Sequence, residues 1–122
     1  SIEIGDGVFC GQGVFITDTS HGYQDPTMPV GKQFGAHDPV VVGAGSWLGH
    51  GAMVMPGARL GRNVVVAAGS VVRGEVEDHA VVAGNPARVV RRLEPDVGWV
   101  GSRGDVRPVV PQAEMLARLA EG

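Results

Sequence analysis

The sequence has few cysteines, which cross-link many small domains, and few aromatic residues, which fill many compact cores. Only one of its 122 residues is a cysteine, which excludes a disulfide within the chain and any site built from several cysteines. Aromatic residues make up 5% of the chain although 43% of it is hydrophobic. The interior must therefore consist mainly of valine, alanine, leucine and isoleucine.

Two other features are also missing. The formal net charge is −3, which gives no electrostatic reason to expect a nucleic-acid partner. No apolar run reaches the length of a membrane-spanning helix, and no secretory signal is recognisable. We therefore expect a cytoplasmic protein without a membrane span.

What the sequence does contain is a six-residue repeat. Glycine follows the repeating residue at several positions, and small or β-branched residues lie two positions before it. The repeating aliphatic residues are Val42, Leu48, Val54, Leu60, Val66 and Val72. The same period opens the chain at Ile4, Cys10 and Ile16. We expect these side chains to point inward, with Cys10 acting as a small buried apolar residue.

A period of six predicts a parallel β-helix, in which each hexad supplies a short strand and a turn. If three hexads form one coil, residues 42–59 and 60–77 are two full coils and residues 4–21 begin a third. The repeat stops between Ile16 and Val40. The intervening segment, residues 17–39, is rich in proline and glycine, and we expect an ordered protruding loop.

The repeat ends before the C-terminus. Residues 94–111 show no clear period and are rich in glycine and proline. Residues 111–121 predict a short helix, with proline in its first turn and an apolar face of Met115, Leu116 and Leu119. We expect that face to cover a coil edge or to dock on a neighbouring subunit.

Four stretches together resemble the hexapeptide-repeat O-acetyltransferases, in particular the maltose, galactoside and colanic-acid group. They are ITDTSHGY, PVVVGAGSWLGHGAMVMPGARLG, VVAAGSVV and VVAGNPARVV. The resemblance covers roughly residues 2–93 and does not extend to the final thirty or so residues. It implies an all-β domain over residues 1–93, folded as a left-handed parallel β-helix with the loop as an insertion, and a separate C-terminal extension over residues 94–122. It also implies a homotrimer with acetyl-CoA as donor and active sites between subunits.

Within this resemblance His21 corresponds to the catalytic histidine. Imidazole suits a base that accepts a hydroxyl proton near neutral pH. We therefore expect His21 to activate the hydroxyl of a sugar or glycan acceptor. Asp18, three residues earlier, is a candidate to orient the imidazole or contact the substrate; a turn-forming role is the alternative. Trp47 should project outward, either as a wall of the substrate cleft or in packing against a neighbouring subunit.

The donor would be held at the corners of the coils. The resemblance places backbone contacts to the pantetheine arm at Gly49–His50 and at Ala68. His50 as a second catalytic histidine and Ala68 as an ordinary corner residue are the alternatives. Guanidinium groups suit the phosphates of CoA, and Arg88 and Arg73 are the candidates. We expect Arg91 and Arg92 to be surface residues.

Two other function classes remain open. A non-catalytic trimerisation scaffold is one, because the chain starts within the repeat and we expect it to lack earlier coils that supply part of the acceptor pocket. A metallohydrolase of the carbonic-anhydrase-like type is the other. It would need several metal ligands, and the four histidines, at positions 21, 37, 50 and 79, contain no closely spaced pair. We expect no metal site.

Overall fold

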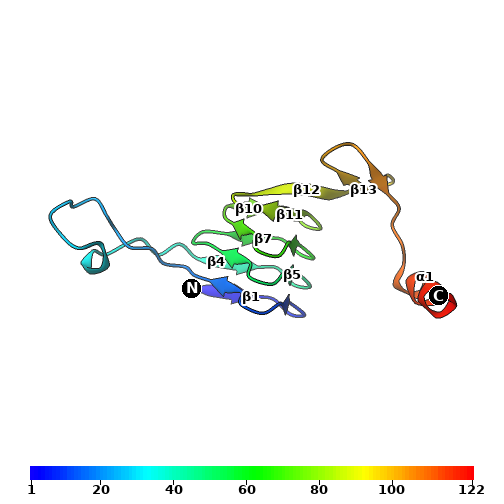
Figure 1. The fold of residues 1–122 in the computed structure, drawn as a ribbon, viewed down its shortest axis with the longest axis horizontal. Coiled ribbons are helices and arrows are strands. Elements are labelled where there is room, and N and C mark those ends of the chain that lie inside the picture. The colour runs from blue at the N-terminus through cyan, green and yellow to red at the C-terminus, as the bar shows by residue number, and fades with distance from the viewer.

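The computed structural model describes residues 1–122 and consists mostly of short strands with one short C-terminal helix (Figure 1). The strands form three sheets, which we call faces A, B and C. Face A comprises β1 (Ile2–Ile4), β4 (Val40–Val42), β7 (Arg59–Leu60) and β10 (Glu75–Val76). Face C comprises β3 (Phe15–Ile16), β6 (Met53–Val54) and β9 (Val71–Val72). Face B comprises β2 (Phe9–Cys10), β5 (Trp47–Leu48), β8 (Val65–Val66), β11 (Val81–Gly84), β12 (Ala87–Glu94), β13 (Gly98–Gly101) and β14 (Val106–Arg107).

Successive coils pair in parallel, so the chain visits the three faces in turn and stacks each hexad on the equivalent hexad of the previous coil. On face C, Ile16 pairs with Val54 and Val54 with Val72. On face B, Leu48 pairs with Val66 and Val66 with Val82. The period of six therefore predicts the register correctly up to Val72. Beyond it the register is shorter than predicted, because Leu60 pairs with Val76 and Val66 with Val82.

The core is the column of side chains inside these coils. It contains 13 buried hydrophobic residues, including all six repeating aliphatic residues of the second and third coils, each at most 3% exposed. The two buried serines are hydrogen-bonded, which removes the cost of placing a hydroxyl in this interior. Ser46 Oγ, for example, accepts a hydrogen bond from Val64 N at 3.0 Å and donates one to Gly61 O at 3.2 Å.

The prediction that Cys10 is buried is wrong. Its side chain is exposed, and Ile4 is 53% exposed. Both belong to the first coil of the described chain, which has a coil on only one side. An inward-pointing residue there is covered from above by β4 or β5 but not from below.

The chain leaves the parallel coils after β11. From Ala87 onward β12, β13 and β14 pair antiparallel and extend face B as a meander. The predicted domain boundary at residue 93 therefore falls inside a strand, and the segment without a clear period contains β13 and β14. Sequence periodicity missed these strands because their residues are partly buried on both faces of a projecting ribbon, without a hexad core to repeat.

Two segments project from the coils, as Figure 1 shows. One is the insertion between β3 and β4, which contains a single 3₁₀ turn, η1 (Val30–Lys32). The other is α1 (Gln112–Glu121), which is in the predicted place and directly follows Pro111. Every residue of α1 is exposed, so its apolar face does not cover an edge of its own coils.

Candidate active site

The insertion between β3 and β4 is a long loop that pairs with itself at its base. We call residues 17–39 the arm, and its two sides the outgoing and returning strands. At its base Thr19 forms an antiparallel bridge with His37, and Asp38 N donates a hydrogen bond to Asp18 O at 2.8 Å. The outgoing and returning strands lie very close together where they pass Gly35. A Cβ at that position would overlap the Ser20 carbonyl. The arm is therefore ordered by its own contacts.

The aromatic residues of the arm do not anchor it to the coils of its own chain. Tyr23 is 72% exposed and Phe34 is fully exposed.

His21 lies in a pocket of ≈ 640 Å³ between the base of the arm and face C. The arm contributes most of the lining, including His37, while Phe15 and Met55 come from face C and the corner that follows it. The His21 side chain is exposed to this open pocket. A catalytic base needs such access to a substrate hydroxyl.

The orientation of the His21 ring is set by a backbone carbonyl. His21 Nδ1 lies 3.3 Å from Gln33 O on the returning strand of the arm. A carbonyl oxygen can only accept, so this contact requires the hydrogen on Nδ1 in the neutral ring. Nε2 is then left with its lone pair free to accept a proton.

Asp18 lies at the base of the arm, three residues before His21. Its carboxylate accepts a hydrogen bond from the Ser1 ammonium at 2.7 Å, and no hydrogen bond joins it to His21. The hydrogen bond from the N-terminal ammonium lowers the pKa of Asp18, while partial burial opposes that shift. The Gln33 carbonyl, and not the Asp18 carboxylate, contacts the His21 ring in this structure.

Gly49, His50 and Ala68 meet at the corner between faces B and C. His50 and Ala68 occupy equivalent positions in successive coils, and Gly69 N donates a hydrogen bond to His50 O at 2.8 Å. The His50 and Ala68 side chains are exposed at this corner, whereas Gly49 is buried. A Cβ at Gly49 would lie 2.7 Å from Ala68 N, so close stacking of the coils alone requires glycine there.

The two candidate arginines lie at different corners. Arg88 is exposed on β12 opposite Ala83. It lies beside the turn between β11 and β12, which stacks on the corner of His50 and Ala68. Arg73 directly follows β9 and stacks on Met55, which lines the His21 pocket. Arg73 thus belongs to the corner from which the arm departs.

Trp47 projects outward, as predicted, and is 50% exposed. It lies on face B, stacked between Phe9 of the first coil and Val65 of the third. Phe9 is itself 67% exposed, so this column gives face B an apolar outer strip.

Within one chain the predicted site residues therefore form two separate groups. His21 and Arg73 lie at the corner between faces C and A, while His50, Ala68 and Arg88 lie at the corner between faces B and C. None of the second group lines the His21 pocket. Sequence reasoning missed two residues that shape this pocket, Gln33 and Met55, because neither carries a group that signals catalysis.

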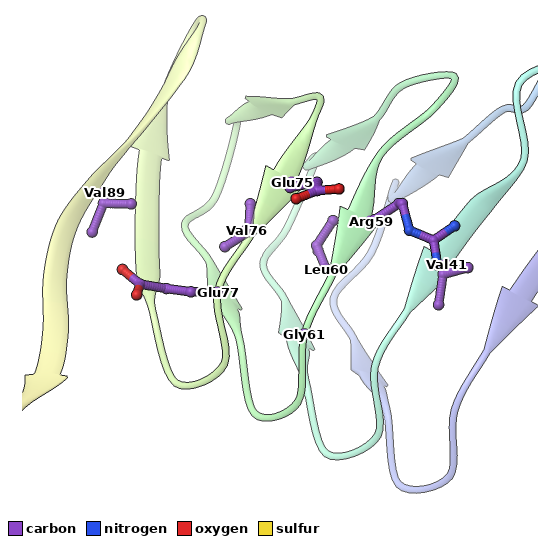
Figure 2. A pocket seen from close by; sticks show the side chains of 8 residues that line it. All are labelled: Val41, Arg59, Leu60, Gly61, Glu75, Val76, Glu77 and Val89. Atoms are coloured by element: carbon purple, nitrogen blue, oxygen red, sulfur yellow. The ribbon is translucent and has the colours of Figure 1, made fainter. Parts of the chain in front are cut away.

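A second hollow, of ≈ 590 Å³, lies on face A and contains none of the predicted site residues (Figure 2). Arg59 and Glu75 are register neighbours on β7 and β10 there. Glu77 lies 3.6 Å from Arg92. These side chains form a surface of mixed charge.

No group of three or more histidine, cysteine, aspartate or glutamate side chains is arranged to hold a metal ion. No helix has the length and apolar character needed to cross a membrane.

Comparison with known proteins agrees with the repeats and the fold described above. Residues 39–74 match the family described as bacterial transferase hexapeptide (six repeats). The chain is 33% identical over 120 residues to a probable acetyltransferase of Mycobacterium tuberculosis, covering 98% of this chain and 37% of that protein. It is 34% identical over 92 residues to galactoside O-acetyltransferase of Lactococcus lactis, covering 75% of this chain and 44% of the relative. The chain thus spans less than half the length of these relatives.

Two solved structures have similar folds. Galactoside acetyltransferase in complex with coenzyme A has a TM-score of 0.68 and 28% identity, covering 77% of this chain and 46% of that one. A hexapeptide-repeat acetyltransferase of Vibrio cholerae, complexed with acetyl coenzyme A, has a TM-score of 0.58 and 27% identity over 76% of this chain and 61% of that one. By its repeats, its fold and these relatives, the chain resembles the hexapeptide-repeat O-acetyltransferases.

Proposed function

We propose that this protein is a CoA-dependent O-acetyltransferase that moves an acetyl group from acetyl-CoA to a hydroxyl of a sugar or glycan. The observation that carries the proposal is the His21 pocket, in which the Gln33 carbonyl directs Nδ1 and leaves Nε2 available as a base. The named acetyltransferase relatives and the solved complexes with CoA and acetyl-CoA support the choice of donor.

In the proposed reaction, His21 Nε2 takes the proton from the acceptor hydroxyl while that oxygen attacks the thioester carbonyl. A backbone N–H or a nearby polar group stabilises the oxyanion of the tetrahedral intermediate. The intermediate then collapses with loss of the CoA thiolate, which takes the proton back from the imidazolium. The products are the acetyl ester and CoA, and no other reactant is needed.

The site also requires a second subunit in this proposal. The coils wind with the left-handed sense that the resemblance implies, and three chains associate around a common axis. His21 and Arg73 of one chain then face Gly49, His50, Ala68 and Arg88 of a neighbour. Trp47 contributes to the wall of the cleft between them. The exposed apolar residues Trp47 and Phe9 on face B and Phe15 on face C support an association of this kind.

The test is CoA release from acetyl-CoA across a panel of sugars, comparing the unaltered protein with His21→Ala. Loss of the general base should lower turnover by roughly 10²–10⁴-fold. The matched control is His79→Asn. His79 lies outside the arm with φ at 61°, a conformation that asparagine tolerates.

The control should transfer acetyl groups at the unaltered rate. Unchanged turnover in His21→Ala would remove His21 from the mechanism. A protein that assembles but neither binds CoA nor releases it from acetyl-CoA would instead be a scaffold.

A further inference from the structure

The side chain of Gln33 uses its whole amide to bind the outer end of the arm. Gln33 Oε1 accepts a hydrogen bond from Asp25 N at 3.1 Å. Gln33 Nε2 donates to Asp25 O at 2.8 Å and to Met28 O at 3.1 Å. One partly buried side chain thus satisfies three backbone groups of the turn formed by residues 25–28.

That turn is already shaped locally. Asp25 Oδ1 accepts hydrogen bonds from Thr27 N at 2.9 Å and from Thr27 Oγ1 at 2.6 Å. The hydrogen bond from the Thr27 hydroxyl, followed by that from its backbone N–H, lowers the pKa of the Asp25 carboxyl. The turn is therefore a preformed unit to which Gln33 attaches the returning strand.

Beyond His21, no backbone hydrogen bond joins the outgoing and returning strands of the arm. The bonds that join the outgoing and returning strands, from Ser20 N to Ala36 O and from Asp38 N to Asp18 O, lie at the base of the arm. Past that point the cross-links to the outgoing strand are the hydrogen bonds of the Gln33 amide and the His21 contact itself. Gln33 N also donates a hydrogen bond to Val30 O at 3.0 Å at the end of η1, but this bond stays within the returning strand. The attachment of Gln33 to the turn of residues 25–28 consequently depends on its side chain.

We propose that Gln33 is a positioning residue for His21: its amide fixes the returning strand against the tip of the arm, and its carbonyl thereby selects the ring orientation and the Nδ1–H tautomer. The inference rests on the proposed role of His21 as the base. It assigns to one residue both the clamp that holds the arm and the acceptor that directs the imidazole.

The direct test is the tautomer of His21, read from imidazole ¹⁵N chemical shifts in protein labelled at histidine, with the resonances assigned by loss in His21→Ala. The unaltered protein should show hydrogen on Nδ1 of the neutral ring. In Gln33→Ala the carbonyl is no longer held, and the Nε2–H form should appear. An unchanged Nδ1–H signature in Gln33→Ala would overturn the proposal.

Activity gives the second readout. Gln33→Ala should lower kcat for acetyl transfer by roughly 10- to 10²-fold, since a displacement of about 1 Å at a reacting group has such an effect. The KM for acetyl-CoA and the thermal midpoint should stay unchanged, because the arm lies outside the coil core. A fall in the thermal midpoint together with a rise in KM would indicate a general structural role and count against positioning.

Two further variants sharpen the comparison. Gln33→Glu keeps the size but replaces the donating NH₂ with an acceptor beside two carbonyl oxygens, so it should be as impaired as Gln33→Ala. Gln24→Ala is the matched control in the same arm, because the Gln24 amide contacts only the adjacent Tyr23 N, at 2.9 Å. Equal effects from Gln24→Ala and Gln33→Ala would overturn the specific assignment.

The tautomer measurement separates this inference from the proposed function. If His21→Ala retains full turnover, the function proposal fails, yet the ¹⁵N shifts still report whether Gln33 directs the ring. If His21→Ala is inactive and the Gln33 variants show unchanged shifts and turnover, the positioning role alone fails.

Discussion

Glycine recurs after the inward aliphatic residue because the coils approach each other too closely there for a side chain. At Gly49 the obstacle is Ala68 N of the next coil, and at Gly43 it is Gly61 O. The left-handed backbone angles fall elsewhere, for example at Gly51 with φ at 67°. The repeat thus uses glycine for close approach at one position and for φ at another.

Substituting Gly49 with alanine should therefore destabilise the coil stack. This effect is separate from the candidate role of Gly49 in contacting the donor. Forcing a methyl group against backbone atoms in a packed interior costs about 1–3 kcal/mol. Urea unfolding of Gly49→Ala measures this cost. Gly31→Ala is the control, since a Cβ at Gly31 meets no atom within 4 Å and should leave stability unchanged. Equal midpoints for both variants would contradict the close-approach explanation.

Among the elements, the coils were predictable from the sequence and the arm was only partly so. Each hexad of the coils repeats the same local conformation. The position of Leu48 or Val66 in its hexad therefore indicates where its side chain points and which residues it stacks on. The arm depends on contacts between residues far apart in the sequence, such as His21 with Gln33, and no periodicity encodes them. For the same reason the sequence named His21 and offered Asp18 as a candidate to orient it, but gave no sign of the Gln33 carbonyl.

The meander formed by β12, β13 and β14 also depends on specific long-range contacts. Arg91 Nη2 donates a hydrogen bond to Asp105 Oδ2 at 2.8 Å, and Arg91 Nη1 donates to Trp99 O at 3.1 Å. The Arg91 hydrogen bond lowers the pKa of Asp105, against a smaller opposing effect of desolvation. The Arg91 guanidinium, on β12, thus binds both β13 and the loop that follows β13.

This pair should make the order of the meander depend on pH. Because the pKa of Asp105 is lower in the folded state than its ordinary value of 3.8, the contribution is present above that value and disappears as pH falls below it. Hydrogen exchange over residues 98–107 should be faster in Asp105→Asn than in the unaltered protein at pH 7. The difference between the two proteins, compared at equal pH, should shrink below pH 3.8. A difference that persists at low pH would show that the ion pair is not its source.

At the scale of the whole molecule, the distribution of exposed groups is the main finding. The His21 pocket and the corner of His50 and Ala68 lie at opposite edges of face C, so one chain does not bring them together. The apolar residues of the arm and of α1, among them Phe34 and Leu119, are exposed as well. Closed rotational symmetry would bring one edge of face C against the other edge on a neighbouring copy.

Mixing two inactive variants tests whether the site is shared between chains. His21→Ala removes the base, and Ala68→Trp should block the donor corner while leaving the buried core unchanged, because Ala68 is exposed. Each variant alone should be inactive in acetyl transfer. If every site takes its base from one chain and its donor corner from the next, random co-assembly of equal amounts should restore about a quarter of the sites. If both groups served the same site within one chain, every chain would carry a lesion and the mixture would stay inactive. The CoA-release rate of the co-refolded mixture, set against that of separately refolded variants combined afterwards, distinguishes these outcomes.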